Sequence, residues 1–278
     1  MDRHILLIDC PDAKGLVYRI TGVLYEAGAN IVANGEFVDG RLGHFFMRTE
    51  FSGDCDHQDL QLRLEAVLPA AARLQLSRPR RKKIVLLATR EHHCLGDLLL
   101  RHAHGELDAA IAAVVSNRPD LGELVRRFEL PFHCVPHQDK PRQEHEAEVM
   151  AQVAAYEPEY LVLAKYMRIL TPHFIDAYPR RIVNIHHSFL PAFIGANPYR
   201  QAFERGVKII GATAHFVTDD LDEGPIIAQS VIPVDHTHSA AAMTQAGRDV
   251  EKVVLARALQ LVFEERVMVS GNRTIVFD

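Results

Sequence analysis

The most constraining feature of this 278-residue chain is a set of short apolar runs that do not alternate with polar residues. Four of them lie beyond the first 80 residues, at 83–88, 109–115, 160–164 and 181–185. A strand forms such a run when both of its faces are buried, as in a parallel sheet covered by helices. Helical stretches separate the runs, at 95–104, 121–128 and 143–156. The alternation predicts a doubly wound α/β domain with a mostly parallel sheet.

The same domain continues with two further strands and one long helix. The strands are expected at 208–217 and 226–234, and the helix at 240–265, followed by a short tail. In an open α/β sheet, ligands bind beyond the carboxyl ends of the strands. Polar residues that follow these strands are therefore the first candidates for a functional site.

The first 80 residues carry a different pattern, which predicts the order βαββαβ of a ferredoxin-like α+β unit. Strands are expected at 5–8, 31–38 and 42–51 and helices at 16–27 and 60–74, followed by a short edge strand. A polar stretch with five cationic residues among seven, at 77–83, is typical of an exposed linker. We therefore expect one domain at 1–80 and a second at 84–278.

Composition excludes several classes of function. The formal net charge of -5 argues against a nucleic-acid partner, and no apolar run is long enough to cross a membrane. The four cysteines form no CxxC pair, and the first residues lack the apolar core of a signal peptide. Free thiols in a reducing cytoplasm are expected. The sixteen histidines form no HExxH or Cys/His motif, so no metal site is expected.

Polar side chains gather at the ends of two neighbouring strands. Asn184 and His186 lie two residues apart, so their side chains project from the same face of a strand, whereas His187 is expected on the opposite face. The loop after the next strand carries four carboxylates, at Asp219, Asp220, Asp222 and Glu223. A strand-end histidine and a solvated acidic loop are each ordinary features. Together they could bring an amide, an imidazole and a carboxylate to one cleft, which suits acyl-group chemistry.

The second domain resembles the formyltransferase family that handles 10-formyltetrahydrofolate. The resemblance rests on the Asn-x-His strand end with the later aspartate, and on four further matches: Ser188, Leu190, Pro191 and Phe193 after the histidine; the segment 167–170; Gly211; and His215. It implies catalytic roles for Asn184, His186 and Asp222 and no cofactor. It also implies substrate contacts at Met167, Arg168, Leu170, Gly195 and His215. Arg168 could meet the glutamate tail of the folate or an internal carboxylate, and Ile169 is expected to pack in the core.

One branch of this family transfers the formyl group to a phosphorylated amine, and carries a glycine-rich Gly-x-Gly-Ser-Asn-Leu loop whose backbone amides cradle the phosphate. Here the corresponding stretch is ATREHHCLGD, in which the small residues are missing and Glu91 would repel a phosphate. Loss of the acceptor site leaves water as the acceptor. The resemblance therefore implies a hydrolase that releases formate and balances one-carbon pools for purine synthesis.

In the mechanism that these residues suggest, Asp222 positions and deprotonates the attacking water, directly or through His186. Asn184 and His186 then donate hydrogen bonds to the developing oxyanion, each worth roughly 100- to 1,000-fold in rate. Two alternatives remain at this point. One is a formyltransferase with an unidentified acceptor, and the other is a non-catalytic sensor of folate or amino acids.

The N-terminal unit resembles the ACT module, a regulatory domain that often binds amino acids. Its best match is the turn and helix start in DCPDAKGLVYRITGVL. The resemblance implies an amino-acid effector, with methionine and glycine as candidates because one-carbon supply links folate to both. Such modules commonly pair edge to edge, so a homo-oligomer is expected.

Overall fold

The computed structural model describes residues 2–191 and 198–278 and divides the chain into two compact units. One unit runs up to Arg80 and includes two C-terminal segments, Glu264–Met268 and Ile275–Asp278. The other unit holds Arg81–Phe263 and Val269–Thr274. The change at Arg80 lies inside the expected linker. The expected second domain, 84–278, differs at its end, because the last residues fold instead of forming a tail and are divided between the two units.

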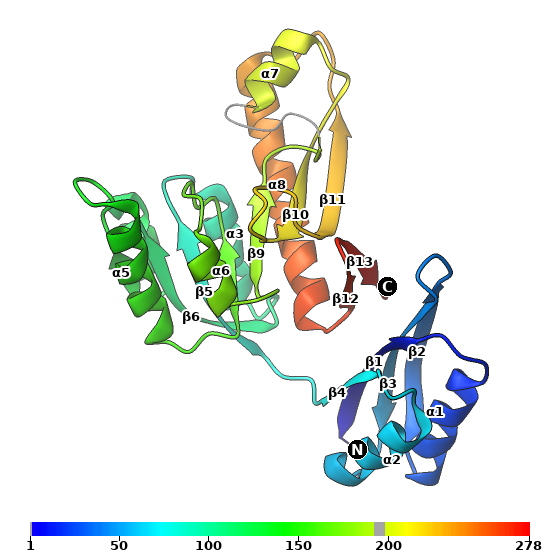
Figure 1. Ribbon diagram of the computed structural model, residues 1–278. Coiled ribbons are helices and arrows are strands. Elements are labelled where there is room, and N and C mark those ends of the chain that lie inside the picture. Colours follow the sequence, from blue (N-terminus) through cyan, green and yellow to red (C-terminus); the bar gives the residue numbers. More distant parts are fainter. Residues whose placement is uncertain (1, 192–197) are drawn as a thin grey trace. The chain divides into compact units, whose positions relative to one another are not determined.

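The N-terminal unit is a four-stranded antiparallel sheet with two helices (Figure 1). The strands are β1 (Arg3–Pro11), β2 (Asn30–Asp39), β3 (His44–Ser52) and β4 (Arg73–Ser77), and the helices are α1 (Leu16–Glu26) and α2 (His57–Val67). Their order in the sheet is β2-β3-β1-β4. The predicted βαββαβ arrangement is confirmed.

Alternate residues of β1 build the core of this unit. Leu6 and Ile8 pack with Ile20 of α1 and Leu64 of α2, and all four residues are fully buried, at 0% exposure. The expected helix at 60–74 was too long, because the backbone turns extended at Leu68, immediately before Pro69. A residue before proline is disfavoured in the helical region, so α2 ends there and the chain is free to form β4.

The second unit is built on a seven-stranded sheet with the order β11-β10-β9-β8-β5-β6-β7. Its strands are β5 (Lys82–Ala88), β6 (Ala109–Ser116), β7 (Phe132–Cys134), β8 (Tyr160–Leu163), β9 (Ile182–His186), β10 (Ile209–Phe216) and β11 (Ile226–Pro233). The five strands β5 to β9 are parallel, whereas β10 and β11 run antiparallel to their neighbours. The mostly parallel sheet predicted from the apolar runs is confirmed.

Helices cover the faces of this sheet (Figure 1). They are α3 (His93–Ala103), the 3₁₀ turn η1 (Pro119–Leu121), α4 (Gly122–Arg126), α5 (Arg142–Ala154), α6 (Pro172–Ala177), α7 (Pro198–Arg205) and α8 (Ala240–Phe263). Val85 and Leu87 of β5 pack with Val149 of α5 and Phe174 of α6. The alternate residues of β5 are equally buried, and α8 contacts β9, β10, β11 and α3. Burial of both faces explains why the strands have no polar alternation.

The residues after α8 form a two-stranded hairpin of β12 (Val267–Ser270) and β13 (Arg273–Val276), which the sequence pattern did not predict. At its turn, the amide of Asn272 donates a hydrogen bond to the backbone carbonyl of Glu223 at 2.8 Å. The Thr274 hydroxyl donates to the carbonyl of Ile226 at 2.5 Å. The hairpin therefore anchors the chain at Glu223 and at Ile226, on either side of the turn that connects the acidic loop to β11. Within the described residues, no helix has the length and apolar character needed to cross a bilayer.

Candidate active site

The candidate site forms where β9 ends beside β10. These strands pair antiparallel, and the register sets Asn184 opposite His215. After β10 the chain turns back sharply at Gly224, where a Cβ atom would lie 1.8 Å from the carbonyl oxygen of Phe216. Only glycine fits so close to the strand end. The turn returns the acidic loop to β9, and Asp222 reaches the end of that strand.

Asp222 meets His186 at a distance of 3.2 Å between Oδ1 and Nδ1. Its backbone has φ of 58°, a left-handed conformation that aspartate tolerates better than most residues. Burial pushes the pKa of the Asp222 carboxyl upward, but the hydrogen bond and charge of His186, with His215 and His187 nearby, outweigh burial and lower the pKa below its ordinary value. Asp222 is therefore held as a carboxylate facing the imidazole.

Hydrogen bonds fix the orientation of Asn184 through His215. The Nδ1 of His215 lies 2.9 Å from the carbonyl oxygen of Phe216, which can only accept, so Nδ1 carries the proton. The other ring nitrogen must then accept, and it receives the side-chain amide of Asn184 at 3.2 Å. Burial lowers the pKa of His215, which keeps this arrangement neutral. His215 thus orients Asn184, and it lies 3.7 Å from Asp222.

Asn184, His186, His215 and Asp222 line one cavity of about 550 Å³. With Nδ1 committed to Asp222, the Nε2 atom of His186 is buried and has no hydrogen-bond partner within residues 2–191 and 198–278. A buried imidazole nitrogen without a partner lowers the stability of the fold, unless a bound ligand forms the missing hydrogen bond. The three residues expected to be catalytic are therefore brought together, with one polar atom left for a bound molecule.

The segment after β8 lines another side of this cavity. Met167 and Ile169 are exposed hydrophobic residues, at 58% and 57%, while Leu170 is buried. The expectation that Ile169 packs in the core was wrong, because alternate residues of this loop face outward. Arg168 also lines the cavity, and no described carboxylate pairs with it. Gly195 and Phe193, two further residues implied by the resemblance, lie outside the described residues.

Polar contacts with neighbouring elements hold this segment in place. The hydroxyl of Thr89 accepts a hydrogen bond from the backbone of Met167 at 3.0 Å. Arg142 donates to the carbonyl of Ile169 at 2.7 Å, and the buried carboxylate of Glu146 accepts the backbone amide of Thr171 at 2.8 Å. The apolar rim of the cavity is thus fixed at three points, by Thr89 immediately after β5 and by Arg142 and Glu146 of α5.

His187 lines the same cavity as His186, contrary to the expectation from strand alternation. Regular β structure ends at His186, so the alternation rule no longer applies to the next residue. The two rings stack with centroids 4.9 Å apart and an angle of 25° between their planes. Burial, and next the charge of Lys165, lower the pKa of His187 to about 3. A neutral imidazole therefore packs directly on His186.

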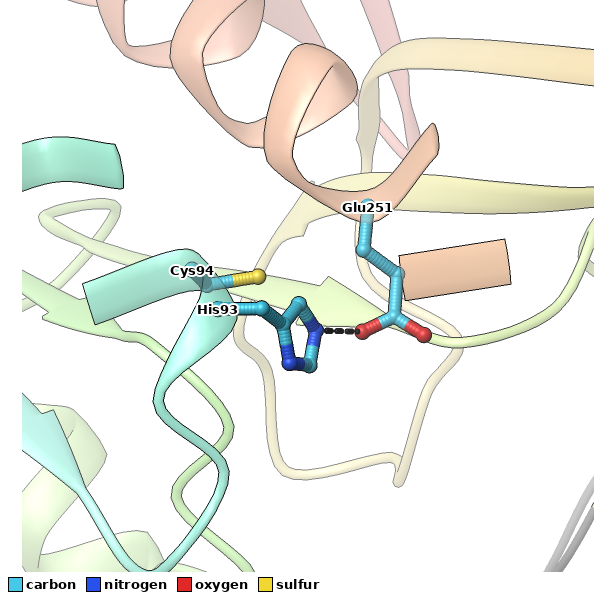
Figure 2. A group of neighbouring side chains, drawn as sticks. All are labelled: His93, Cys94 and Glu251. Carbon is cyan, nitrogen blue, oxygen red and sulfur yellow. Dashed lines mark hydrogen bonds and ion pairs between the residues drawn. The ribbon is translucent and has the colours of Figure 1, made fainter. Parts of the chain in front are cut away.

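A buried ion-pair cluster in this cavity was not predicted. Glu251 of α8, at 1% exposure, receives the ring of His93 and the hydroxyl of Tyr199, each at 2.7 Å, and Lys165 approaches to 3.2 Å. Figure 2 shows His93 pointing from the start of α3 to the Glu251 carboxylate. Gly247 makes room for this, since a Cβ atom there would lie 2.1 Å from the Tyr199 ring. The sequence signal that could have indicated this cluster is Glu251 itself, a charged residue on the apolar face of the last helix.

His93, Cys94 and Glu251 form the one group of potential metal ligands found among the described residues, with ligand atoms within 4.8 Å of one another (Figure 2). The carboxylate oxygen that a metal would use is already shared by the His93 ring and the Lys165 ammonium. Burial, reinforced by the charge of Glu251, raises the pKa of the Cys94 thiol far above its ordinary value, whereas metals bind the thiolate. These donors suit an ion-pair cluster better than a metal site.

Comparison with known proteins gives consistent results. The family model described as formyl transferase matches residues 82–259. Formyltetrahydrofolate deformylase from Escherichia coli is 55% identical over 276 residues, covering 99% of both chains. The crystal structure of a formyltetrahydrofolate deformylase from Pseudomonas syringae superposes with a TM-score of 0.95 at 41% identity, over 100% of this chain and 95% of that one. Glycinamide ribonucleotide transformylase 1 from Symbiobacterium toebii gives a TM-score of 0.68 at 32% identity, over 71% of this chain and 95% of that one.

Replacing His187 with Gln should flatten the pH dependence of stability in mildly acidic solution. The unfolded histidine takes up a proton near pH 6.5, whereas the folded one does so only near pH 3, so the unfolded chain binds more protons in between. Stability of the wild type therefore falls as the pH drops through this window, with a ceiling of about 1.4 kcal/mol per pH unit for one proton. The measurement is urea unfolding between pH 4 and 7. The same change at exposed His173 is the control, and equal slopes for wild type and His187→Gln would contradict the analysis.

Proposed function

Because this chain belongs to the formyl transferase family and, along almost its whole length, to the formyltetrahydrofolate deformylases, we propose that it hydrolyses 10-formyltetrahydrofolate to formate and tetrahydrofolate. The observation that carries this function is the extent of the similarity. The deformylase from Escherichia coli matches 99% of this chain, whereas the transformylase from Symbiobacterium toebii matches 71%. The chain is thus a hydrolase that cleaves a carbon–nitrogen bond.

The side of the cavity formed by the loop after β5 supports water as the acceptor. Glu91, in the loop where transferring relatives are expected to hold a phosphate, pairs with Arg248 of α8 at 2.8 Å. The cation is therefore already neutralised by a carboxylate of the same chain. A phosphorylated amine would have to displace this pair and meet the negative charge of Glu91, which makes a formyltransferase with another acceptor the weaker alternative.

In the proposed reaction, a water molecule attacks the formyl carbon and gives one proton to the Asp222 carboxylate. The electron pair of the carbon–oxygen double bond moves to the formyl oxygen. Asn184 stabilises this oxyanion with the amide hydrogen that His215 leaves unused, and His186 donates from Nε2. Each such donor is worth roughly 100- to 1,000-fold in rate.

Collapse of the tetrahedral intermediate breaks the carbon–nitrogen bond, and His186 protonates the leaving nitrogen. Asp222 then releases its proton to solvent, and Nε2 of His186 takes one up from solvent while Nδ1 keeps its hydrogen bond to Asp222, which restores the starting charges. The formic acid produced loses its proton to solvent and leaves as formate. The sum is one water consumed and one proton released, with no change in oxidation state, and no cofactor takes part in any step.

The apolar rim supplies a place for the folate ring. Met167 and Ile169 expose hydrophobic side chains at the cavity, and Leu170, which also lines it, is buried. Arg168 has no described carboxylate partner, which favours the glutamate tail of the folate as its partner over an internal one. Gly195 remains a predicted substrate contact.

The decisive experiment is an assay without any acceptor. Purified protein and 10-formyltetrahydrofolate alone should yield formate and tetrahydrofolate in equal amounts, because solvent supplies the nucleophile. The readout is formate measured with a coupled dehydrogenase, alongside the absorbance change of the folate. Product that appears only after an amine is added would establish the transferase alternative. Folate binding with neither product would establish the non-catalytic sensor.

Replacing Asp222 with Asn should lower kcat at least about 1,000-fold, since an amide can neither accept the water proton nor hold His186 as a charged pair. Folate binding should change less than about threefold. Asparagine tolerates the left-handed backbone of this position, so the loop should keep its shape. Asp220→Asn, at an exposed position of the same loop, is the matched control and should retain activity. An Asp222→Asn protein as active as the wild type would refute this mechanism.

The N-terminal unit is proposed to be an ACT-like regulatory module, supported by its βαββαβ order and separate core. Methionine or glycine at about 1 mM should change kcat or KM of deformylation several-fold, because a ligand can shift activity only through unequal affinity for two states. Titration of each amino acid into the assay tests this, with alanine as a control. No response to either amino acid would argue against them as effectors.

Three further properties belong to this proposal. The cysteines of the chain are all free thiols, which supports a reducing, cytoplasmic location. Released formate would enter one-carbon pools that feed purine synthesis. The long edge strand β2 exposes Val32 and Phe37, which supports pairing into a homo-oligomer.

A further inference from the structure

Lys165 stands at the end of β8 in a conformation that is unusual for its residue type. Its φ of 64° lies in the left-handed region, which costs a non-glycine residue on the order of 1 kcal/mol. Only 8% of the residue is exposed, yet it lines the cavity that contains His186. The fold therefore accepts local strain and burial in order to keep an ammonium group at the site.

The ammonium is held from one side only. An ammonium group has three hydrogens to donate, and among the described residues its one acceptor is Glu251, at 3.2 Å. The carboxylate itself is immobilised by the His93 ring and the Tyr199 hydroxyl. Lys165 is thus anchored by a fixed partner while it retains donors for a further anion in the cavity.

His187 extends this positive region toward the reacting residues. Its ring lies close enough to Lys165 for that charge to be the second cause, after burial, of its lowered pKa, so the ring is neutral and keeps an N–H to donate. The same ring stacks on His186. No hydrogen bond joins it to another described residue. An ammonium and a neutral N–H donor therefore share the part of the cavity beside the proposed catalytic imidazole.

We propose that Lys165 and His187 form a subsite that receives the formate product. This inference rests on the proposed hydrolysis: once the formic acid has lost its proton and Asp222 is again ionised, two carboxylates share the cavity. Two like charges in a poorly solvated cavity repel strongly unless a cation accompanies them. Lys165 supplies that cation, because it lines the same cavity as Asp222, and a one-carbon carboxylate is small compared with that cavity. The glutamate tail of the folate offers the same chemistry and is separated from formate by the experiment.

The test measures inhibition of deformylation by added sodium formate. In Lys165→Met, the inhibition constant for formate should rise at least about tenfold, as expected for loss of a charge-assisted hydrogen bond. Lys165→Arg keeps the charge and should stay near the wild type. Lys252→Met is the matched control, since Lys252 pairs with Asp249 at 2.8 Å and does not line the cavity. Broadening of the formate proton resonance by wild-type protein, and its loss in Lys165→Met, gives a readout that does not depend on turnover.

Each outcome decides a separate point. An unchanged formate constant in Lys165→Met would overturn the subsite. A tenfold rise in KM for the folate with an unchanged formate constant would also overturn it and assign Lys165 to the glutamate tail. If wild-type protein releases no formate, the proposed function is wrong. Broadening of the formate proton resonance would still test whether formate binds at Lys165. If Lys165→Met does not fold, the double variant Lys165→Met with Glu251→Gln is used in its place, because it removes both charges of the ion pair.

Discussion

The candidate site depends on the register between β9 and β10. Pairing Asn184 with His215 sets the side-chain amide against an imidazole whose other nitrogen is tied to the backbone of Phe216. A shift of one strand by one residue would turn its side chains to the opposite face of the sheet and separate Asn184 from His215. The closeness of Gly224 to the end of β10 then returns the acidic loop to His186. One hydrogen-bond ladder and one glycine thus determine where the catalytic groups meet.

The sequence was sufficient for the layers of the fold and for the central trio of the site. Short, unbroken apolar runs predicted these strands well because a strand buried on both faces has few positions for polar residues. Three-residue β7 and the hairpin after α8 are too short to carry a period, and His187 was misplaced because regular strand geometry ends one residue earlier. The cluster around Glu251 joins residues 158 positions apart in the chain, from His93 to Glu251. Periodicity cannot reveal contacts that depend on tertiary packing.

Two charged residues of the cavity, Asp222 and Lys165, adopt left-handed backbone conformations. Residues in such conformations persist only where the surrounding structure determines them strongly. Asp222 sits on a turn whose ends are held by Asn272 and Thr274, and Lys165 is tied to a carboxylate that three donors share. Asp222 and Lys165 thus line one cavity, and each is secured by contacts with residues other than Asn184 and His186.

The division of the C-terminal hairpin between the two compact units has a consequence for the gene. Because Glu264–Met268 and Ile275–Asp278 group with the N-terminal unit, no single cut in the coding sequence separates complete units. Arg48 of β3 donates to the backbone carbonyls of Glu264 and Glu265, so an N-terminal fragment ending at the linker would lose acceptors for a buried guanidinium. Recombination that exchanges the N-terminal unit between related proteins would therefore have to carry two separate stretches of sequence, one up to Arg80 and one after Phe263.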